Sequence, residues 1–249
     1  MYSFCIHHCN SLGLPPKYYH LAMYLARSAN PKPGEISLAH NGVLFLDELP
    51  EFDRHVLEVL REPLESGKVT ISRAASQAEF PARFQLVAAM NPCPCGHYGN
   101  ANRCRCSSND VKRYLNKLSG PFLDRIDMHV EVPPVPNEQL LSPSAHGTVS
   151  SAEVRDTVMV ARQTQIARGK LNADLSPQDL QTHCALAEAE KKLLESALEK
   201  LGLSARAYHR ILRVARTIAD LSQSDNIGRS HLLEALSYRR LERLQQVLS

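Results

Sequence analysis

No stretch of this 249-residue sequence is apolar enough to cross a membrane. A transmembrane helix needs a run of about 18 apolar residues, and the sequence contains none. The first residues mix His, Cys and Asn with apolar side chains, which is not the pattern of a signal peptide. The hydrophobic fraction of 43% is ordinary for a soluble globular protein. We therefore expect a cytoplasmic protein with no membrane partner.

The sequence also has little excess charge of either sign. Its 29 Lys and Arg residues against 26 Asp and Glu residues leave a net charge of +3, which indicates no particular class of partner. Its seven cysteines are expected to be reduced in the cytoplasm. Close groups of cysteines therefore favour metal binding over disulfides.

A third absence is a phosphate-binding loop of the form G-x-x-x-x-G-K-[ST], which many ATPases carry near the N-terminus of their nucleotide domain. Residues 1–32 form an atypical N-terminal segment instead. Four of them are metal-ligand types, but they are too crowded to favour a metal site: Cys5, His7, His8 and Cys9.

The motif around which the chain is organised is a short apolar run, Val43–Leu46, followed by two acids. Such a run predicts a strand buried on both faces of a parallel sheet, with the acids at its carboxyl end, where α/β sheets place ligands. This is the Walker B pattern, in which Asp47 holds Mg²⁺ and Glu48 polarises the water that attacks the γ-phosphate of ATP. The alternative is a buried strand that simply meets a polar loop.

A second buried strand is predicted over Phe84–Met90, and Asn91 follows it. If the two strands are neighbours, the Asn91 amide lies beside the Walker B acids and can orient the attacking water or contact the γ-phosphate. The alternative is a turn starter, because Asn-Pro favours turns.

Between these strands, Lys68–Arg73 alternates as a strand and is expected to pair with Phe80–Phe84 around a turn at Ala74–Ala78. The sharper hypothesis is a projecting hairpin whose cations Lys68 and Arg73 contact nucleic-acid phosphates. The alternative is a solvated edge hairpin.

Two C-x-C pairs follow Asn91 and can supply four thiolates to one tetrahedral zinc ion: Cys93, Cys95, Cys104 and Cys106. The single-residue spacing is tighter than in common zinc sites, and free cysteines are the alternative. The same segment has a basic surface that can attract phosphates, formed by Arg103, Arg105, Lys112, Arg113 and Lys117.

Arg125 precedes a predicted third strand, Met128–Val132. It is either a surface ion-pair partner or an arginine finger that reaches the nucleotide of a neighbouring subunit.

A proline-rich linker at residues 136–150 then separates a core, residues 33–135, from a helical part, residues 151–249. In that part, the helix expected over residues 204–221 carries Arg206 in its first turn. A cation there opposes the helix dipole, so this position favours a role for Arg206 in binding an anionic partner. The helices are expected over residues 152–168, from 177, over 186–201, 204–221 and 230–248.

These motifs together resemble the magnesium chelatase-like AAA+ ATPases of the ComM/YifB type. The matching residues are Pro33–Gly42 running into Walker B, Met90–Gly96, Gly120–Asp127 and Arg206–Arg210. The resemblance implies an α/β fold, namely a partial AAA+ (P-loop NTPase-like) parallel-sheet core followed by an all-helical lid domain. It implies ATP and Mg²⁺ as cofactors and a homo-oligomer, a hexameric ring, that acts on single-stranded or branched DNA as a helicase or branch-migration motor.

The resemblance also implies residue roles. Asp47 and Glu48 are the Walker B acids, Asn91 is sensor 1, Arg125 is the arginine finger and Arg206 is sensor 2. The segment from Lys68 to Phe84 is the pre-sensor hairpin.

The sequence departs from that family in lacking the phosphate loop and an N-terminal domain, so we expect a truncated reading of a longer gene. Without the loop there is no Lys for the β- and γ-phosphates, and ATP hydrolysis by this chain is expected to be weak. Two alternatives are a non-catalytic DNA-binding or ring-assembly module and a metal-chelatase subunit.

Overall fold

The structure, a computed structural model, describes residues 33–73, 76–133, 135 and 149–239. The chain divides into two compact units between Arg125 and Ile126. The first unit is mixed α/β, and the second is helical in its described part. The expectations for residues 1–32 and for most of the 136–150 linker lie outside the described residues.

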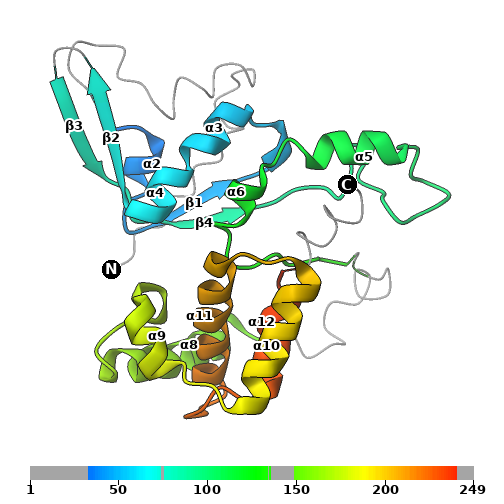
Figure 1. The fold of residues 1–249 in the computed structure, drawn as a ribbon. Coiled ribbons are helices and arrows are strands. Elements are labelled where there is room, and N and C mark those ends of the chain that lie inside the picture. The colour runs from blue at the N-terminus through cyan, green and yellow to red at the C-terminus, as the bar shows by residue number, and fades with distance from the viewer. Residues whose placement is uncertain (1–32, 74–75, 134, 136–148, 240–249) are drawn as a thin grey trace. The chain divides into compact units, whose positions relative to one another are not determined.

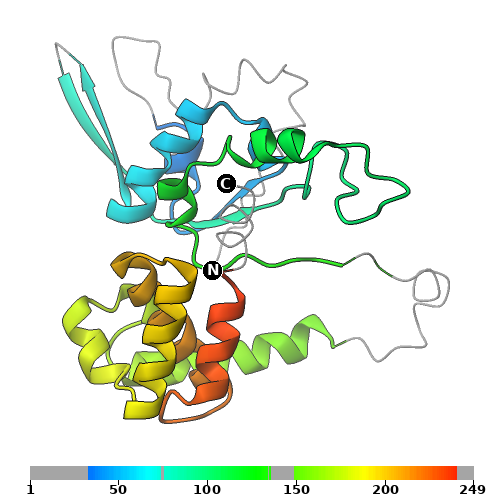
Figure 2. The ribbon, with the colours of Figure 1, turned by 45° about the vertical axis from the view of Figure 1, so that its right-hand side comes forward.

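The first unit contains a parallel pair of strands, β1 (Val43–Leu46) and β4 (Gln85–Ala88), in register Val43↔Gln85 to Leu46↔Ala88 (Figure 1). The predicted parallel neighbours are confirmed, but the prediction that both strands are buried on both faces is wrong. On β1 only Leu44 and Leu46 are buried, and on β4 Val87 is 39% exposed. The reason is that, within the described chain, the sheet has only these two strands, with helices α3 and α4 along one side (Figures 1 and 2).

The apolar residues of segment 52–64 have helical spacing and predict one helix, but the structure divides that segment into two helices. A 3-10 turn, η3 (Leu49–Glu51), is followed by α3 (Arg54–Val59) and α4 (Arg61–Ser66). Pro63 accounts for the break, because it has no N–H to donate to the carbonyl four residues earlier, that of Val59. Glycine suits a left-handed cap, and Gly67 ends α4 with φ of +70°. A short helix, α2 (Glu35–Leu38), precedes β1.

The predicted hairpin is present, with different bounds. Strand β2 (Lys68–Arg73) pairs antiparallel with β3 (Ser76–Pro81), in register Lys68↔Pro81 to Arg73↔Ser76. The predicted return strand at residues 80–84 is therefore wrong. Pairing begins at Ser76, four residues earlier than expected.

Two helices of the first unit were not predicted. Helix α5 (Ser108–Leu115) begins at a capping box in which Ser107 and Asp110 satisfy each other's backbone N–H groups. The run Ser119-Gly120-Pro121 predicts a break in the chain, but helix α6 (Gly120–Leu123) begins there. Ser119 accepts from the Phe122 N–H at its start, and Pro121 is tolerated in its first turn.

The second unit consists of helices packed around one apolar core, with α11 at its centre. Local capping signals mark the ends of its helices: Ser176 caps a helix with Pro in its first turn, and Gly169 and Gly202 follow helix ends with positive φ. The elements are α8 (Ser151–Ala167), η5 (Asn172–Asp174), α9 (Pro177–His183), α10 (Glu188–Leu201), α11 (Ala205–Leu221) and α12 (Arg229–Ser237). None of the described helices is long and apolar enough to cross a membrane.

The third strand predicted over Met128–Val132 does not form. The His129 N–H donates to the Tyr238 carbonyl at 2.7 Å, and the Arg239 guanidinium donates to the carbonyl of Ile126. This segment therefore bonds to the end of α12 instead of to a strand, and it belongs to the helical unit.

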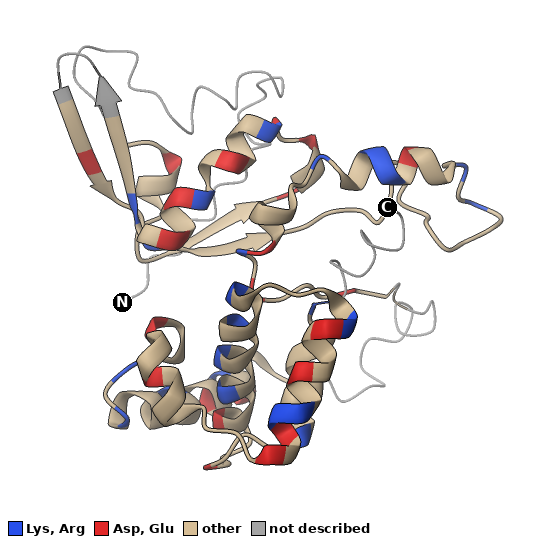
Figure 3. Cartoon of the chain, viewed as in Figure 1, with Lys and Arg blue, Asp and Glu red and all other residues tan. Residues whose placement is uncertain are grey.

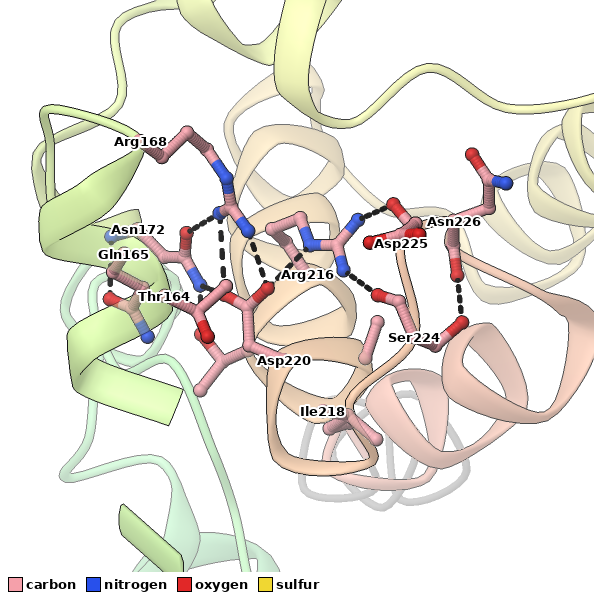
Figure 4. A network of polar contacts seen from close by, with 12 residues as sticks. Thr164, Gln165, Arg168, Asn172, Arg216, Ile218, Asp220, Ser224, Asp225 and Asn226 are labelled. Atoms are coloured by element: carbon pink, nitrogen blue, oxygen red, sulfur yellow. Dashed lines mark hydrogen bonds and ion pairs between the residues drawn. The ribbon is translucent and has the colours of Figure 1, made fainter. Parts of the chain in front are cut away.

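A buried polar network ties α8, η5 and α11 together (Figure 4). The Asp220 carboxylate is fully buried and accepts from Arg168 at 2.5 Å, from Asn172 at 2.7 Å and from Arg216 at 3.1 Å. Arg216 also donates to the carbonyls of Ser224 and Asp225, which closes the chain after α11.

Candidate functional site

The paired acids lie directly after β1, as predicted, and both are exposed at the strand end. Asp47 Oδ1 accepts the Glu48 N–H at 2.9 Å. Glu48 has φ of 52° and ψ of 47°, in the left-handed region that side chains other than glycine rarely adopt. Such strain clusters at functional sites.

Asn91 is brought to the same edge of the sheet. The Ala89 N–H donates to the Leu46 carbonyl at 2.8 Å, and the Leu49 N–H donates back to the Ala89 carbonyl at 3.0 Å. Ala89 is thus hydrogen-bonded both to the residue before the two acids and to the residue after them. The structure therefore gathers Asp47, Glu48 and Asn91 at one strand end.

Tyr114 is a neighbour of this edge that sequence reasoning missed. Burial raises the pKa of its hydroxyl, the charge of Glu51 raises it further, and a backbone hydrogen bond from Asn91 opposes both. The ring belongs to the apolar face of α5, with Val111 and Leu115. The helical spacing of these three residues was the sequence signal from which the burial of Tyr114 could have been predicted.

The four cysteines expected to hold zinc come together. Their sulfur atoms lie within 4.8 Å of one another, with Cys93 Sγ 3.4 Å from Cys95 Sγ and 3.9 Å from Cys104 Sγ. Thiolates at about 2.3 Å from a tetrahedral zinc ion are separated by roughly 3.8 Å. The donor set and its spacing therefore fit one such ion.

The thiols also differ in how readily they ionise. The backbone N–H groups of His97 and Arg105 lower the pKa of Cys95 to about 6. The hydrogen bond between Cys106 and Cys95 raises the pKa of Cys106 to about 12. A thiolate at Cys95 beside a protonated Cys106 is a suitable starting point for a metal that displaces the remaining proton.

Arg125 is buried, with its guanidinium donating to the Pro121 carbonyl at 2.7 Å and to Glu65 at 2.5 Å. It thus lies within the first unit, beside α4. Arg206 is exposed in the first turn of α11, after the Ser204 cap, in the second unit. Their roles as arginine finger and sensor 2 stay predictions.

The hairpin cations Lys68 and Arg73 stand at opposite ends of β2. Lys68 lies at the base of the hairpin and pairs with Glu79 at 2.7 Å, while Arg73 lies next to the turn. The two residues are five positions apart along the strand, a distance of roughly 16 Å. Their contact with nucleic acid also stays a prediction.

Comparison with known proteins connects these residues to a family. The family model for magnesium chelatase subunit ChlI matches residues 20–140, and the model for the C-terminal part of that subunit matches residues 148–239. The chain belongs to the magnesium chelatase ChlI family. The two matched regions correspond closely to the α/β and helical parts of the chain.

Similar proteins with curated descriptions cover most of this chain. It is 56% identical over 220 residues to Competence protein ComM of Haemophilus influenzae, covering 88% of this chain and 43% of that protein. It is 54% identical over 226 residues to the YifB protein of Escherichia coli, covering 90% of this chain and 44% of that protein. The magnesium-chelatase 38 kDa subunit of Rhodobacter capsulatus is 28% identical over 228 residues, covering 84% of this chain and 55% of that protein. The chain thus spans under half the length of the ComM and YifB relatives.

Proposed function

We propose that this chain carries the Walker B and sensor half of an AAA+ ATP hydrolase. The observation that supports this most is the meeting of Asp47, Glu48 and Asn91 at the carboxyl end of two parallel strands. Exposed carboxylate oxygens are the donors that Mg²⁺ prefers. Bound there, Mg²⁺ would neutralise charge developing on the nucleotide phosphates.

The protein residues then have separate tasks. Asp47 holds the metal, Glu48 accepts a proton from and orients the attacking water, and the Asn91 amide positions that water or the γ-phosphate. Arg125 acts on the nucleotide of a neighbouring subunit in a hexameric ring, for which its pair with Glu65 must open. Arg206 contacts phosphate from the helical part, which is the lid.

We further propose that the ring acts on DNA and that hydrolysis by these 249 residues alone is slow. They contain no phosphate loop, and the loss of a single well-placed donor to a transition state costs roughly 10²–10³ in rate. The slow rate and the catalytic role of Glu48 are tested together.

Phosphate release from ATP is measured with Mg²⁺, with and without single-stranded DNA, for the unmodified chain, Glu48→Gln and the matched control Glu51→Gln. We expect slow release that Glu48→Gln removes and that Glu51→Gln, three residues away on η3, leaves unchanged. Equal rates for Glu48→Gln and the unmodified chain would contradict the assignment of Glu48.

The same assay separates the alternatives. DNA binding without any phosphate release supports a non-catalytic DNA-binding or assembly module. A DNA-independent rate that responds to a porphyrin-bearing partner instead supports a metal-chelatase subunit.

A second proposal concerns the cysteines: Cys93, Cys95, Cys104 and Cys106 hold one structural zinc ion. The spacing of their sulfur atoms supports it. We expect about one zinc per chain by mass spectrometry of the purified protein. Cys95→Ser should lose it, whereas Cys184→Ser, at a buried cysteine of the helical unit, should retain it. A metal-free preparation that binds no added zinc would overturn the proposal.

A further inference from the structure

Helix α5 has two chemically different faces. Val111, Tyr114 and Leu115 are buried against Cys93. The opposite face holds an amide, two cations and another amide at spacing i, i+3, i+4 and i+7, which places them on one stripe: Asn109, Lys112, Arg113 and Asn116. The chain as a whole has a net charge of only +3, so this stripe concentrates positive charge.

The stripe forms one wall of an open groove. Arg54, at the start of α3, and Lys117 complete its lining, and the cavity has a volume of about 460 Å³. Four of the six lining residues are cationic, and the other two are asparagines. Figure 3 shows Lys and Arg on α5 and on the loop before it.

The carboxylates around this groove hold its cations only weakly. Arg113 pairs with Asp110 at 2.9 Å, and Lys117 pairs with Glu51 at 3.3 Å. The Arg113 side chain is 80% exposed. Exposed ion pairs contribute little, so a phosphate group can replace either carboxylate at small cost.

We propose that this groove binds the phosphodiester backbone of single-stranded DNA, at a surface separate from the β2–β3 hairpin. From Asn109 to Asn116 the stripe rises about 10 Å, which is long enough for Lys112 and Arg113 to face neighbouring phosphates of one strand. The cations neutralise phosphates, and the amides donate to sugar and base atoms between them. The groove is wide open to solvent, so a flexible single strand can lie along it, whereas a duplex is typically read by a helix that protrudes into its major groove.

The test is a salt titration of a fluorescein-labelled single-stranded oligothymidylate, followed by fluorescence anisotropy without ATP. Lys112→Gln/Arg113→Gln is expected to weaken binding about tenfold and to lower the slope of log K against log salt by about 1.4, or about 0.7 for each phosphate that the protein no longer neutralises. Asn109→Ala/Asn116→Ala should lower the affinity and leave the slope unchanged. Melting temperatures check that the variants fold.

A matched control removes two exposed cations elsewhere, by Lys192→Gln/Lys200→Gln on α10. An equal loss of affinity in this control would overturn the proposal, because only net charge would then matter. Displacement of the oligonucleotide by inorganic polyphosphate at equal phosphate concentration, or equal affinity for a duplex, would also overturn it.

A hairpin variant, Lys68→Gln/Arg73→Gln, distinguishes the two surfaces. If it alone abolishes binding while the α5 variant has no effect, the groove is excluded and the hairpin hypothesis stands. Because no ATP is present, either result leaves the proposed hydrolysis to be judged by its own assay.

Discussion

At the scale of single residues, two residues are held in unfavourable states, one through its backbone and one through its side chain. Glu48 adopts a left-handed backbone at the tip of β1, with the buried Leu49 and Pro50 directly after it. His129 has both ring nitrogens buried without a hydrogen-bond partner in the described part of the chain. The backbone strain of Glu48 lies at the candidate site, and the unpaired nitrogens of His129 lie in the helical unit. Each gives a measurable prediction.

Glu48→Gly is expected to raise the free energy of unfolding by up to about 1 kcal/mol. Relief of the left-handed strain, about 1–2 kcal/mol, exceeds the added entropy of a glycine in the unfolded chain, about 0.5–1 kcal/mol. Denaturant unfolding measures the change. The matched Glu51→Gly, at a position without positive φ, should lower stability. A destabilised Glu48→Gly would show that the Glu48 side chain makes a stabilising contact.

His129 is expected to make stability depend on pH. Burial lowers its pKa to about 4, and the Arg239 cation adds to this, while Asp127 opposes it. Above pH ~6.5 the ring is neutral in both the folded and the unfolded protein, and it costs no stability. As the pH falls from about 6.5 to about 4, the folded protein loses stability, because the unfolded state binds the proton more tightly. We expect the protein to be about 2 kcal/mol less stable at pH 5 than at pH 7 from this group.

Urea unfolding of His129→Leu at the two pH values checks this expectation. The variant should lose that part of the pH dependence, and Met128→Leu, at its exposed neighbour, should keep it. An unchanged pH dependence in His129→Leu would contradict the assignment.

At the scale of elements, a few polar contacts decide how the helices are joined. The helix after β1 breaks at Leu60, inside an apolar pattern that predicts one continuous helix, because Pro63 cannot bond to the Val59 carbonyl. In the helical unit, Asp220 joins α8, η5 and α11 through partners up to 52 residues away in the chain. Such a network is costly to leave half-satisfied.

Asp220→Asn is expected to destabilise the protein by about 3–5 kcal/mol, because it leaves the buried Arg216 and the largely buried Arg168 without their carboxylate. Thermal unfolding measures the loss of stability. The control Asp225→Asn, at an exposed carboxyl whose residue contacts Arg216 only through its backbone carbonyl, should change stability by less than about 0.5 kcal/mol. Similar small effects in both variants would contradict a stabilising network.

At the scale of the whole molecule, the division between the units falls between Arg125 and Ile126. The candidate arginine finger therefore ends one unit, and the residues directly after it belong to the other. Asp127 pairs with Arg210 at 2.5 Å, and the Ile126 carbonyl accepts from Arg239.

A fragment of residues 126–239 is expected to be more stable than one of residues 149–239. The shorter fragment leaves the buried Arg239 without the Ile126 carbonyl and the Tyr238 carbonyl without the His129 N–H, which costs about 1–3 kcal/mol for each buried group left unpaired. Circular dichroism melting of the two fragments measures the difference. Equal melting temperatures would show that residues 126–133 add nothing to the helical unit.

Much of this molecule could be predicted from its residues. The parallel pair of strands, the acids at its edge, the helices of the second unit and their glycine and serine caps all follow from local patterns. The approach of four cysteines was also predicted, because two C-x-C pairs in one loop have few other places to go.

Other features depended on partners distant in the sequence. The alternation of Met128–Val132 is typical of a strand, but strands need a neighbour, and here α12 provides the acceptor. The predicted basic surface included Lys112, Arg113 and Lys117, but the groove that they line was not predicted, because it also needs Arg54 from another helix.

The sequence by itself determined the local elements and the chemical types at the strand edge, because turns, caps and apolar periods act over a few residues. Only the tertiary structure decided which face of β1 is buried, where the two units divide and which carboxylates hold Arg125 and Arg216. Burial and pairing of that kind depend on which distant segments occupy the same space, and no local pattern contains that information.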